Sequence, residues 1–459
     1  MTRSVLIVGA GNFGAATALA LARQGDTEVV LVDTTEYPNP RAASHDVNKI
    51  VRDDYPDALY MQMLIKAMPQ WRSNDLYKAY YHEVGMLRAD KTNFGINSLA
   101  SYKRAGVKNE SCFLPVEEVR QRWNGAFATA NFGDLTHVLF NPTVGFAEAD
   151  KALEAVIKEA IDAGVKYVIG EMTKLTFTSD GQCSGIALKS GEVLEADQVL
   201  LCTGAHTPAL LAQSAPKNKD LHCGDRVVAT GAVSFKAKLT GSRKKKFEPI
   251  PVLKNCLDEV KGEGMSILKD GTIKFNCDMC FTNMQTFEAT GDRMSVIPSG
   301  SMFNVWTNEN YIKYFEARAR RTMDGLYGEE VADIKIDSYR MCWDASTPTH
   351  DFLITPHPHC NRLYIATGGS FHSWKFLPVI GEYVKDMLEG KLPEDYAQRW
   401  HWNQPVTGKS ANPTYKIVGD LQDIMSGKLD PKHTPKISVK PNTPAAPMVE
   451  VLADAVTAH

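Results

Sequence analysis

The sequence has few of the features that mark membrane proteins and disulfide-rich secreted proteins. None of its apolar stretches reaches the roughly eighteen residues that a membrane-spanning helix needs. Its nine cysteines, an odd number spread over 459 residues, do not resemble a disulfide framework and favour a reducing compartment. We therefore expect a protein outside the membrane, in the cytoplasm. A peroxisomal location is less favoured because the final residues, TAH, are not an SKL-type signal.

A strong net charge and a metal-binding pattern are also absent. The chain has 51 Lys and Arg against 54 Asp and Glu, so its net charge of -3 creates no field that would gather nucleic acid or anionic lipid. The basic run at residues 243–246 is short and typical of a solvated loop. Cys277 and Cys280 form a CxxC pair, but no second pair or paired histidines stand at zinc-site spacing, so buried or idle thiols are expected. We predict no nucleic-acid partner, no metal, and a monomer or weak homo-oligomer.

A glycine-rich turn between two apolar runs organises the N-terminal part of the chain. Residues 5–8 are apolar, Gly9, Gly11 and Gly14 follow at GxGxxG spacing, and a helical segment leads to a second apolar run that ends at Asp33. This order of strand, turn, helix and strand is typical of dinucleotide binding. The glycines allow a tight turn, a close pyrophosphate and close helix packing, while Asp33 suits a ribose hydroxyl. The alternative is a glycine-rich turn in an ordinary α/β protein.

Two later segments are expected near the same nucleotide. The polar loop after the second strand contains Asp46, Asn48, Lys49 and Arg52. Much later, an apolar strand at 199–202 runs into Thr203, Gly204 and Ala205, where the backbone again has a close approach. FAD proteins commonly return to the first sheet in this way, whereas a nicotinamide dehydrogenase needs only the N-terminal unit. Both remain open on these residues alone.

The remaining chain predicts a mixed α/β protein of two or more domains, since 459 residues exceed one ordinary core. Helices are expected at 57–90, 116–124, 148–163 and 379–388, and strands at 165–169, 172–178, 183–189, 197–202, 227–235, 273–276 and 363–367. From about residue 432 the sequence is rich in Pro, Lys and Thr, which favours an extended C-terminal arm over residues 430–459.

Three blocks of sequence carry a resemblance to a known family. They are GAGNFGAATALALA with SHDVNKIVR, then GTIKFNCD, then MCWDASTPTHDFLITPHP with ATGGSFHSWKFLPVIGEYV. Together they resemble the monomeric sarcosine oxidase and fructosyl amino acid oxidase (amadoriase) family of FAD-dependent amine oxidases, over about residues 4–402. The resemblance implies a glucose-methanol or D-amino-acid-oxidase-like flavoprotein, in which an FAD-binding Rossmann-like domain is interleaved with a mixed-sheet substrate domain. We expect the FAD-binding domain at 1–85, 145–225 and 335–400, and the substrate domain at 86–144 and 226–334.

The family oxidises the carbon–nitrogen bond of secondary amines attached to an amino acid, reduces O2 to hydrogen peroxide, and carries FAD covalently through a cysteine. Cys342 matches that cysteine, although on composition alone it could equally be a buried small hydrophobe. Lys274 matches the lysine that reacts with O2 beside the flavin, the alternative being a surface strand lysine. The partners implied are a small-molecule amine and O2.

The substrate side of the resemblance rests on the loop and on the third block. Arg52 and Lys375 match the pair that holds the substrate carboxylate, which needs cationic donors in an apolar pocket. His372 matches the family's histidine, and Gly369 lies in the glycine turn before the last helix, which can direct its positive end at the flavin ring.

Departures from the family pattern put the substrate in doubt. The segment FHSWK carries Phe371, Ser373 and Trp374 where relatives have smaller glycines and a phenylalanine. The amadoriase arginine segment reads WHWNQP here, and the amadoriase acid falls on Asp278 at best. We therefore predict oxidation of an N-methyl amino acid with an apolar or aromatic side chain, in specialised biosynthesis. Fructosyl amino acids, or saccharopine or pipecolate, are the alternatives, and so is a flavin-binding protein without turnover.

Overall fold

A computed structural model describes residues 3–299, 305–306, 313–404, 410, 415 and 417–429 of the chain. The predicted arm at 430–459 lies outside these residues. Within the described part, no helix is both long and apolar enough to cross a membrane.

A six-stranded sheet forms around the N-terminal glycine turn. Its order is β23-β24-β13-β1-β2-β9, and all neighbours are parallel except β23, which is antiparallel to β24. The strands are β1 (Arg3–Val8), β2 (Thr27–Asp33), β9 (Lys166–Ile169), β13 (Gln198–Leu201), β23 (Leu353–Pro356) and β24 (Leu363–Thr367). Because parallel neighbours share their direction, β1, β2 and β13 all end at one edge, where ligands bind in open α/β sheets.

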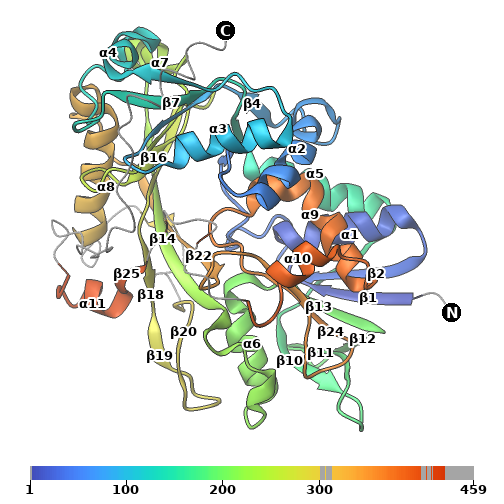
Figure 1. The fold of residues 1–459 in the computed structure, drawn as a ribbon. Helices are drawn as coiled ribbons and strands as arrows, with labels where there is room; N and C mark the ends of the chain where they lie inside the picture. The colour runs from blue at the N-terminus through green and yellow to red at the C-terminus, as the bar shows by residue number, and fades with distance from the viewer. Residues whose placement is uncertain are drawn as a thin grey trace.

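Alternating side chains of β1 build two different cores. Val5 and Ile7 belong to a core to which helices α1 (Asn12–Gln24), α5 (Ala149–Asp162) and α9 (Leu377–Leu388) contribute, and Figure 1 shows these helices grouped on one side of the sheet. Leu6 and Val8 belong to the core shared with a three-stranded sheet of β10 (Met172–Phe177), β11 (Cys183–Leu188) and β12 (Val193–Glu195). Residues 5–8 of β1 are all apolar because both faces of this strand are buried.

A larger sheet of eleven strands stands beside this unit, with helix α8 (Lys313–Tyr327) on its outer side (Figure 1). Its main path is β21-β22-β14-β17-β16-β15-β5-β7-β6, with β18 paired to β14 and β25 paired to β18. The strands are β5 (Met86–Ala89), β6 (Cys112–Pro115), β7 (His137–Asn141), β14 (Val228–Lys238), β15 (Val252–Asn255), β16 (Gly262–Gly264), β17 (Thr272–Cys277), β18 (Cys280–Thr282), β21 (Val305–Trp306), β22 (Ser338–Ser346) and β25 (Ile417–Asp420).

The remaining elements are short or peripheral. A three-stranded sheet is formed by β3 (Lys49–Val51), β8 (Gly145–Ala147) and β4 (Tyr81–Glu83), and a hairpin by β19 (Met284–Thr286) and β20 (Arg293–Ser295). The other helices are α2 (Ala58–Ser73), α3 (Phe94–Ala105), α4 (Val116–Gln121), α6 (Thr207–Ser214), α7 (Gly241–Phe247), α10 (Glu394–Arg399) and α11 (Leu421–Met425).

Two of the expected elements are wrong. The helix expected at 57–90 ends at Ser73, because Asn74 turns to an extended conformation and the fully buried strand β5 pairs on both sides, with β7 and β15. The basic run at 243–246 lies in helix α7 rather than in a loop. Most predicted strands are confirmed to within two residues, and Cys277 and Cys280 are buried free thiols. The two-domain division stays a prediction, although β22 lies in the larger sheet and not in the FAD-binding one.

Candidate active site

One cavity of about 690 Å³ runs from the glycine turn of the six-stranded sheet to strands β14, β15, β16, β17 and β22 of the larger sheet. It brings together almost all of the predicted site residues. Those lining it are Gly9, Gly11, Asp33, Asp46, Lys49, Arg52, Gly204, Lys274, Cys342, Gly369, His372 and Lys375. Gly14 and Asn48 lie behind the lining.

The glycine turn is shaped so that side chains would not fit. Gly9 has a φ of +101°, and a Cβ there would lie 2.4 Å from the carbonyl oxygen of Cys202. A Cβ on Gly14 would lie 1.9 Å from the carbonyl oxygen of Gly9, so the close packing of α1 on β1 needs glycine. Helix α1 starts with Gly11 as its N-cap and has no side-chain cap, and this end of the helix lines the cavity. A pyrophosphate fits this cradle.

Asp33 and Asn12 place polar atoms beside this cradle. The Asp33 carboxylate accepts from the backbone amides of Ala10 and Thr34 at 2.8 and 2.7 Å, which fixes its position at the end of β2. Asn12 is 3% exposed and lines the cavity, and its side-chain oxygen has no hydrogen-bond partner among the described residues. Gly204 has a φ of +51° shortly after β13, and the backbone there lines the same cavity. These features fit the ribose and phosphates of a dinucleotide.

Lys274 is buried within the larger sheet and ion-paired. Its Nζ lies 2.6 Å from Asp46 Oδ2 and donates to the carbonyl oxygen of Asn48 at 2.9 Å. Burial alone would raise the pKa of Asp46, but the positive charges of Lys274, Lys49 and Arg340 outweigh it and hold this pKa far below its usual range. A surface lysine on β17 is therefore excluded, because Lys274 is 2% exposed and faces the cavity. The side chain of Asn48, though predicted to bind cofactor, makes no hydrogen bond to the described residues.

Lys375 is a buried lysine without an ion pair to any carboxylate of the described residues. Its Nζ donates to the Tyr55 hydroxyl at 3.1 Å and to the carbonyl oxygen of His372 at 2.6 Å. Burial, reinforced by the nearby charge of Arg52, lowers the pKa of Lys375 well below its usual value. A carboxylate bound beside Lys375 would favour its charged form and so raise its pKa again. A lysine with these properties suits the binding of a substrate carboxylate.

His372 is held in one tautomer. Its Nε2 lies 2.8 Å from the carbonyl oxygen of His350, and a carbonyl only accepts, so Nε2 carries the proton. Nδ1 then accepts from the Tyr55 hydroxyl at 3.0 Å, and the Tyr55 oxygen is free to accept from Lys375. Burial and the charge of Lys375 lower the pKa of His372 well below 6.5, so the ring is neutral.

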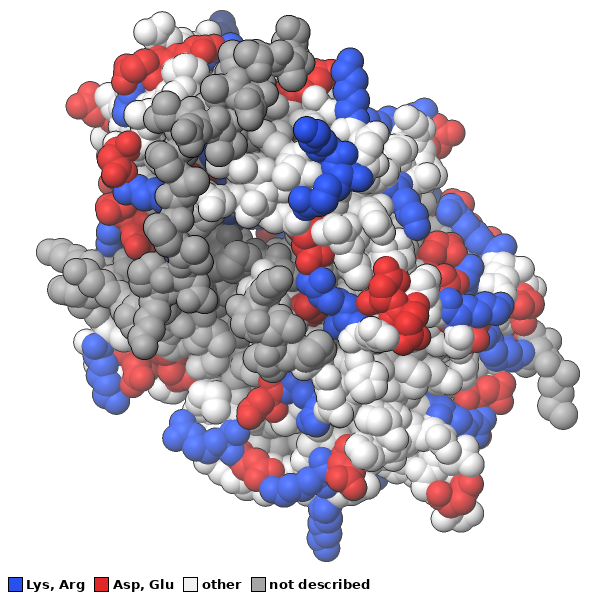
Figure 2. Space-filling model, in the orientation of Figure 1, with Lys and Arg blue, Asp and Glu red and all other residues white. Residues whose placement is uncertain are grey.

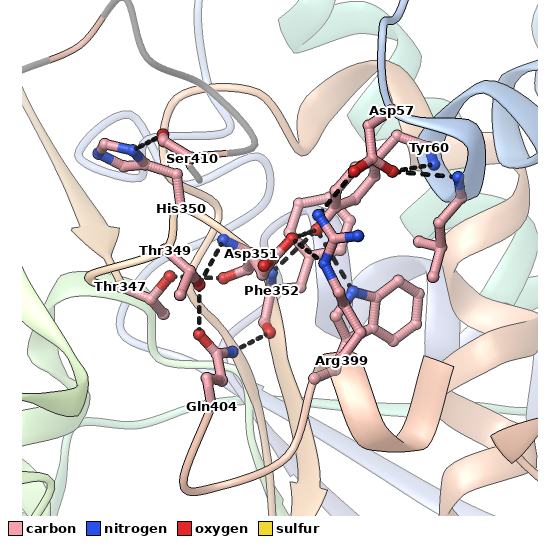
Figure 3. A network of polar contacts seen from close by, with 12 residues as sticks. Asp57, Tyr60, Thr347, Thr349, His350, Asp351, Phe352, Arg399, Gln404 and Ser410 are labelled. Atoms are coloured by element: carbon pink, nitrogen blue, oxygen red, sulfur yellow. Dashed lines mark hydrogen bonds and ion pairs between the residues drawn. The ribbon is translucent and has the colours of Figure 1, made fainter. Parts of the chain in front are cut away.

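The loop that carries His350 is tied down by the network in Figure 3. Arg399 reaches between Asp57, at the start of α2, and Asp351, at distances of 2.7 and 2.9 Å. Tyr60 donates to Asp351 at 2.9 Å, so α2, α10 and the loop between β22 and β23 are joined through one buried carboxylate. We infer that this network keeps the carbonyl of His350 in place beneath His372.

Arg52, which directly follows β3, and Cys342, on β22 of the larger sheet, both reach the cavity. Arg52 is buried, ion-paired with Asp54 at 3.4 Å, and lies over the ring of Tyr55 at 4.6 Å. Cys342 lies on β22 as a partly exposed free thiol that lines the cavity. Gly369 allows a close approach nearby, since a Cβ there would lie 2.7 Å from Ser373 Oγ.

Four residues at the site were missed by sequence reasoning: Tyr55, Lys254, Glu263 and Tyr415. The last three line the cavity, Lys254 and Glu263 from β15 and β16 and Tyr415 from the segment before β25. The sequence Gly-Glu-Gly around Glu263 could have indicated a strand whose face with the two glycines is crowded. A Cβ on either flanking glycine would lie 2.2 to 2.4 Å from Thr322 or Tyr327 of α8, so Glu263 must point to the opposite face. Lys254 and Tyr415 carried no such signal.

Comparison with known proteins decides the family. Residues 4–387 match the protein family described as DAO, FAD dependent oxidoreductase. The chain belongs to this family. It is 25% identical to an L-saccharopine oxidase of Schizosaccharomyces pombe, over 92% of this chain and 98% of that protein. It is 22% identical to a monomeric sarcosine oxidase of a Bacillus species, over 89% and 98% of the two chains.

Solved structures agree. The fructosamine oxidase Amadoriase II of Aspergillus fumigatus superposes with a TM-score of 0.74 at 27% identity, covering 91% of this chain and 94% of that one. The chain is thus an FAD-dependent oxidase of the group that acts on amino acid derivatives, as the three sequence blocks predicted. Figure 2 shows Lys and Arg interspersed with Asp and Glu over the described residues of one face, as expected from a net charge of -3.

Proposed function

We propose that this chain oxidises the carbon–nitrogen bond of a secondary amine in an amino acid derivative, with an N-methyl amino acid as first candidate, and forms an imine and hydrogen peroxide in specialised biosynthesis. One observation carries the proposal. Lys375, a buried cation without an ion-paired carboxylate among the described residues, shares a cavity with Arg52 and with the glycine cradle. A substrate carboxylate is the group that this arrangement lacks.

FAD fits the cradle, and we propose that it is attached through Cys342. Gly9, Gly11, Gly14, Asp33, Gly204 and Gly369 would hold it, together with the loop that contains Asp46, Asn48 and Lys49. When bound, FAD supplies the acceptor of two electrons from the amine and passes them to O2. The thiol of Cys342 lines the cavity and forms no disulfide, so it is available for such a bond.

The protein's own groups position the substrate and exclude water. Arg52 and the third N–H of Lys375 would hold the carboxylate, while Tyr55 and neutral His372 orient the lysine. We propose that the amine enters unprotonated, so that no side chain has to act as its base. Lys274 would place a positive charge where O2 takes up an electron, and its ion pair with Asp46 fixes it there.

Fructosyl amino acids are the second candidate and saccharopine or pipecolate the third. The name of the Schizosaccharomyces relative supports saccharopine, and the solved structures support fructosyl amines. Against the fructosyl class, the WHWNQP segment brings no cation to the cavity. Its Asn403 accepts from Arg226 at 2.9 and 2.7 Å, outside the lining.

Peroxide release from a substrate panel tests the proposal. Sarcosine, N-methyl aromatic amino acids, saccharopine, pipecolate and fructosyl amino acids would be compared at equal concentration with the flavin-loaded protein. We expect an N-methyl amino acid to be turned over fastest. Peroxide from none of them would favour a binding protein without turnover, and a colourless protein active only with a nicotinamide would overturn the proposal.

A further inference from the structure

A buried group of charged residues lies on the larger sheet at the substrate end of the cavity. Lys254 on β15 is 4% exposed, Glu263 on β16 is 6% exposed, and both line the cavity. Lys254 pairs with Glu263 and, at 3.1 Å, with Asp278. Asn276 donates to Glu263 at 2.9 Å, and the hydroxyl of Tyr415 lies 3.3 Å from the same carboxylate. None of these groups is needed to hold FAD or a simple amino acid carboxylate.

The charges of this group do not balance. Two carboxylates, Glu263 and Asp278, share one ammonium group, that of Lys254, while Lys274 is already committed to Asp46. Lys375 is near enough for the charge of Glu263 to act on its pKa, but it forms no ion pair with either carboxylate. The fully buried carboxylate of Asp278 lies 3.1 Å from the Lys254 ammonium, but neither of its oxygens makes a hydrogen bond of good geometry to the described residues. Buried carboxylates of this kind are costly unless a further cation or donor arrives.

The walls beside the group suit an organic cation. The rings of Phe371 and Tyr415 stack with centroids 4.8 Å apart, and both line the cavity. The negative faces of aromatic rings attract cations, as Tyr415 already does with Lys254 at 5.0 Å. A chain of methylene groups could run along these rings and end at Glu263.

We propose that Glu263, Lys254 and Tyr415, which line the cavity, form a subsite for a second, cationic group of the substrate, an ammonium or guanidinium at the far end from the carboxylate. Asp278 lies outside the lining and adds negative charge behind Lys254. The proposal rests on the proposed function, because it takes Arg52 and Lys375 as the carboxylate end. It changes the expected side chain from purely apolar to apolar with a basic end, so the substrate class becomes N-substituted basic amino acids.

Binding of matched unreactive ligands tests the subsite. The ω-amino acids 4-aminobutanoate, 5-aminopentanoate and 6-aminohexanoate would be compared by calorimetry with pentanoate, hexanoate and heptanoate, which replace the ammonium by a methyl group of similar size. Flavin-loaded protein would be used at pH 7.5. We expect at least one ω-amino acid to bind about tenfold more tightly than its alkanoate, as a charge-assisted contact in a dry site provides.

Two variants assign the preference to this group. Glu263→Gln should reduce the preference for the ω-amino acid over its alkanoate several-fold. Asp278→Asn should reduce this preference as well. It keeps the Lys254–Glu263 pair, so it tests the subsite even if Glu263→Gln does not fold. Glu154→Gln, an exposed carboxylate on α5, is the control and should leave it unchanged. For turnover, Nα-methyl-lysine should surpass Nα-methyl-2-aminoheptanoate in kcat/KM in the wild type, and lose that advantage in Asp278→Asn.

The outcomes separate the two proposals. If ω-amino acids bind no better than alkanoates, or if the preference survives both variants, the subsite is wrong while carboxylate binding at Arg52 and Lys375 can still hold. Tighter binding of the dicarboxylates adipate and pimelate would assign Lys254 to a second carboxylate and would also overturn it. If no carboxylate binds at all, the proposed function itself fails.

Discussion

The hydroxyl of Tyr55 lies 3.1 Å from the ammonium nitrogen of Lys375, and through that contact the buried lysine is joined to His372. The oxygen accepts from Lys375 because its own proton is donated to His372 Nδ1. Tyr55 thus stabilises the charged form of a lysine whose pKa burial depresses.

Tyr55→Phe should therefore weaken carboxylate binding without removing the cation. Hydrogen bonds to charged groups contribute about 1.5–3 kcal/mol, so KM should rise about tenfold or more while kcat changes little. The alkaline limb of the kcat/KM profile should shift to lower pH, because the lysine loses its proton more readily. Tyr327→Phe, which removes a buried hydroxyl of α8 outside the cavity lining, is the matched control. An unshifted alkaline limb would contradict this role for Tyr55.

Much of the FAD end was predictable because glycine spacing reports backbone geometry directly. Gly9 needs glycine for its φ of +101°, and Gly14 needs it because a Cβ would meet the carbonyl oxygen of Gly9. Both reasons lie within the turn, so GxGxxG and the burial of residues 5–8 carried that information. The same local logic located Asp33, whose distance from the glycines is set by one helix and one strand.

The charged subsite was not predictable for the opposite reason. Lys254, Glu263, Asp278 and Tyr415 come from four separate segments, and strand pairing in the larger sheet alone brings them together. The sequence prediction of one helix over 57–90 was too long for a similar reason. Residues 86–89 form strand β5 because they pair with β7 and β15, and this pairing outweighs their local helical preference.

Cys342→Ala should release FAD when the protein is denatured, whereas the wild type should keep it. The physical reason is that only a covalent bond survives loss of the folded pocket. Cys277 also lines the cavity, so Cys277→Ala is the matched control and should retain its flavin. Mass spectrometry of peptides checks the claim, and flavin on another cysteine or on none would refute it.

Lys274→Met should slow reaction of the reduced enzyme with O2 about a hundredfold, with a much smaller effect on reduction by substrate. Losing one preorganised electrostatic contact costs about 3 kcal/mol, and this charge acts when O2 gains an electron. Stopped-flow absorbance separates the two half-reactions. Lys236, the cross-strand neighbour of Lys274 on β14, lies outside the cavity lining, and Lys236→Met is the control. Slowing confined to the anaerobic half-reaction would reject the assignment.

Asp278→Asn should change how stability depends on pH. Burial and the neighbouring charge of Glu263 raise the pKa of Asp278 to about 6, against the attraction of Lys254. Between its unfolded pKa of about 4 and this value the folded state holds the extra proton, so Asp278 lowers the free energy of unfolding progressively as pH rises through that window. The variant should not lose stability in this way. Relative to wild type, its free energy of unfolding should therefore rise by up to about 3 kcal/mol between pH 4 and 7. Denaturant unfolding at both pH values measures it, and a pH-independent difference would contradict the raised pKa.

Arg52→Ala should raise KM for carboxylate substrates strongly, by about a hundredfold, because a buried charge-assisted contact to the carboxylate is lost. The matching amine without a carboxylate should be a poor substrate of wild type and variant alike. Arg88→Ala is an unusually close control. Like Arg52, Arg88 is buried, pairs with an aspartate two residues on and lies over Phe94, but it does not line the cavity. Both variants should lose stability, since each leaves a buried aspartate unpaired. Only Arg52→Ala should raise KM, and equal KM values for the two variants would show that Arg52 acts through the fold and not through the substrate.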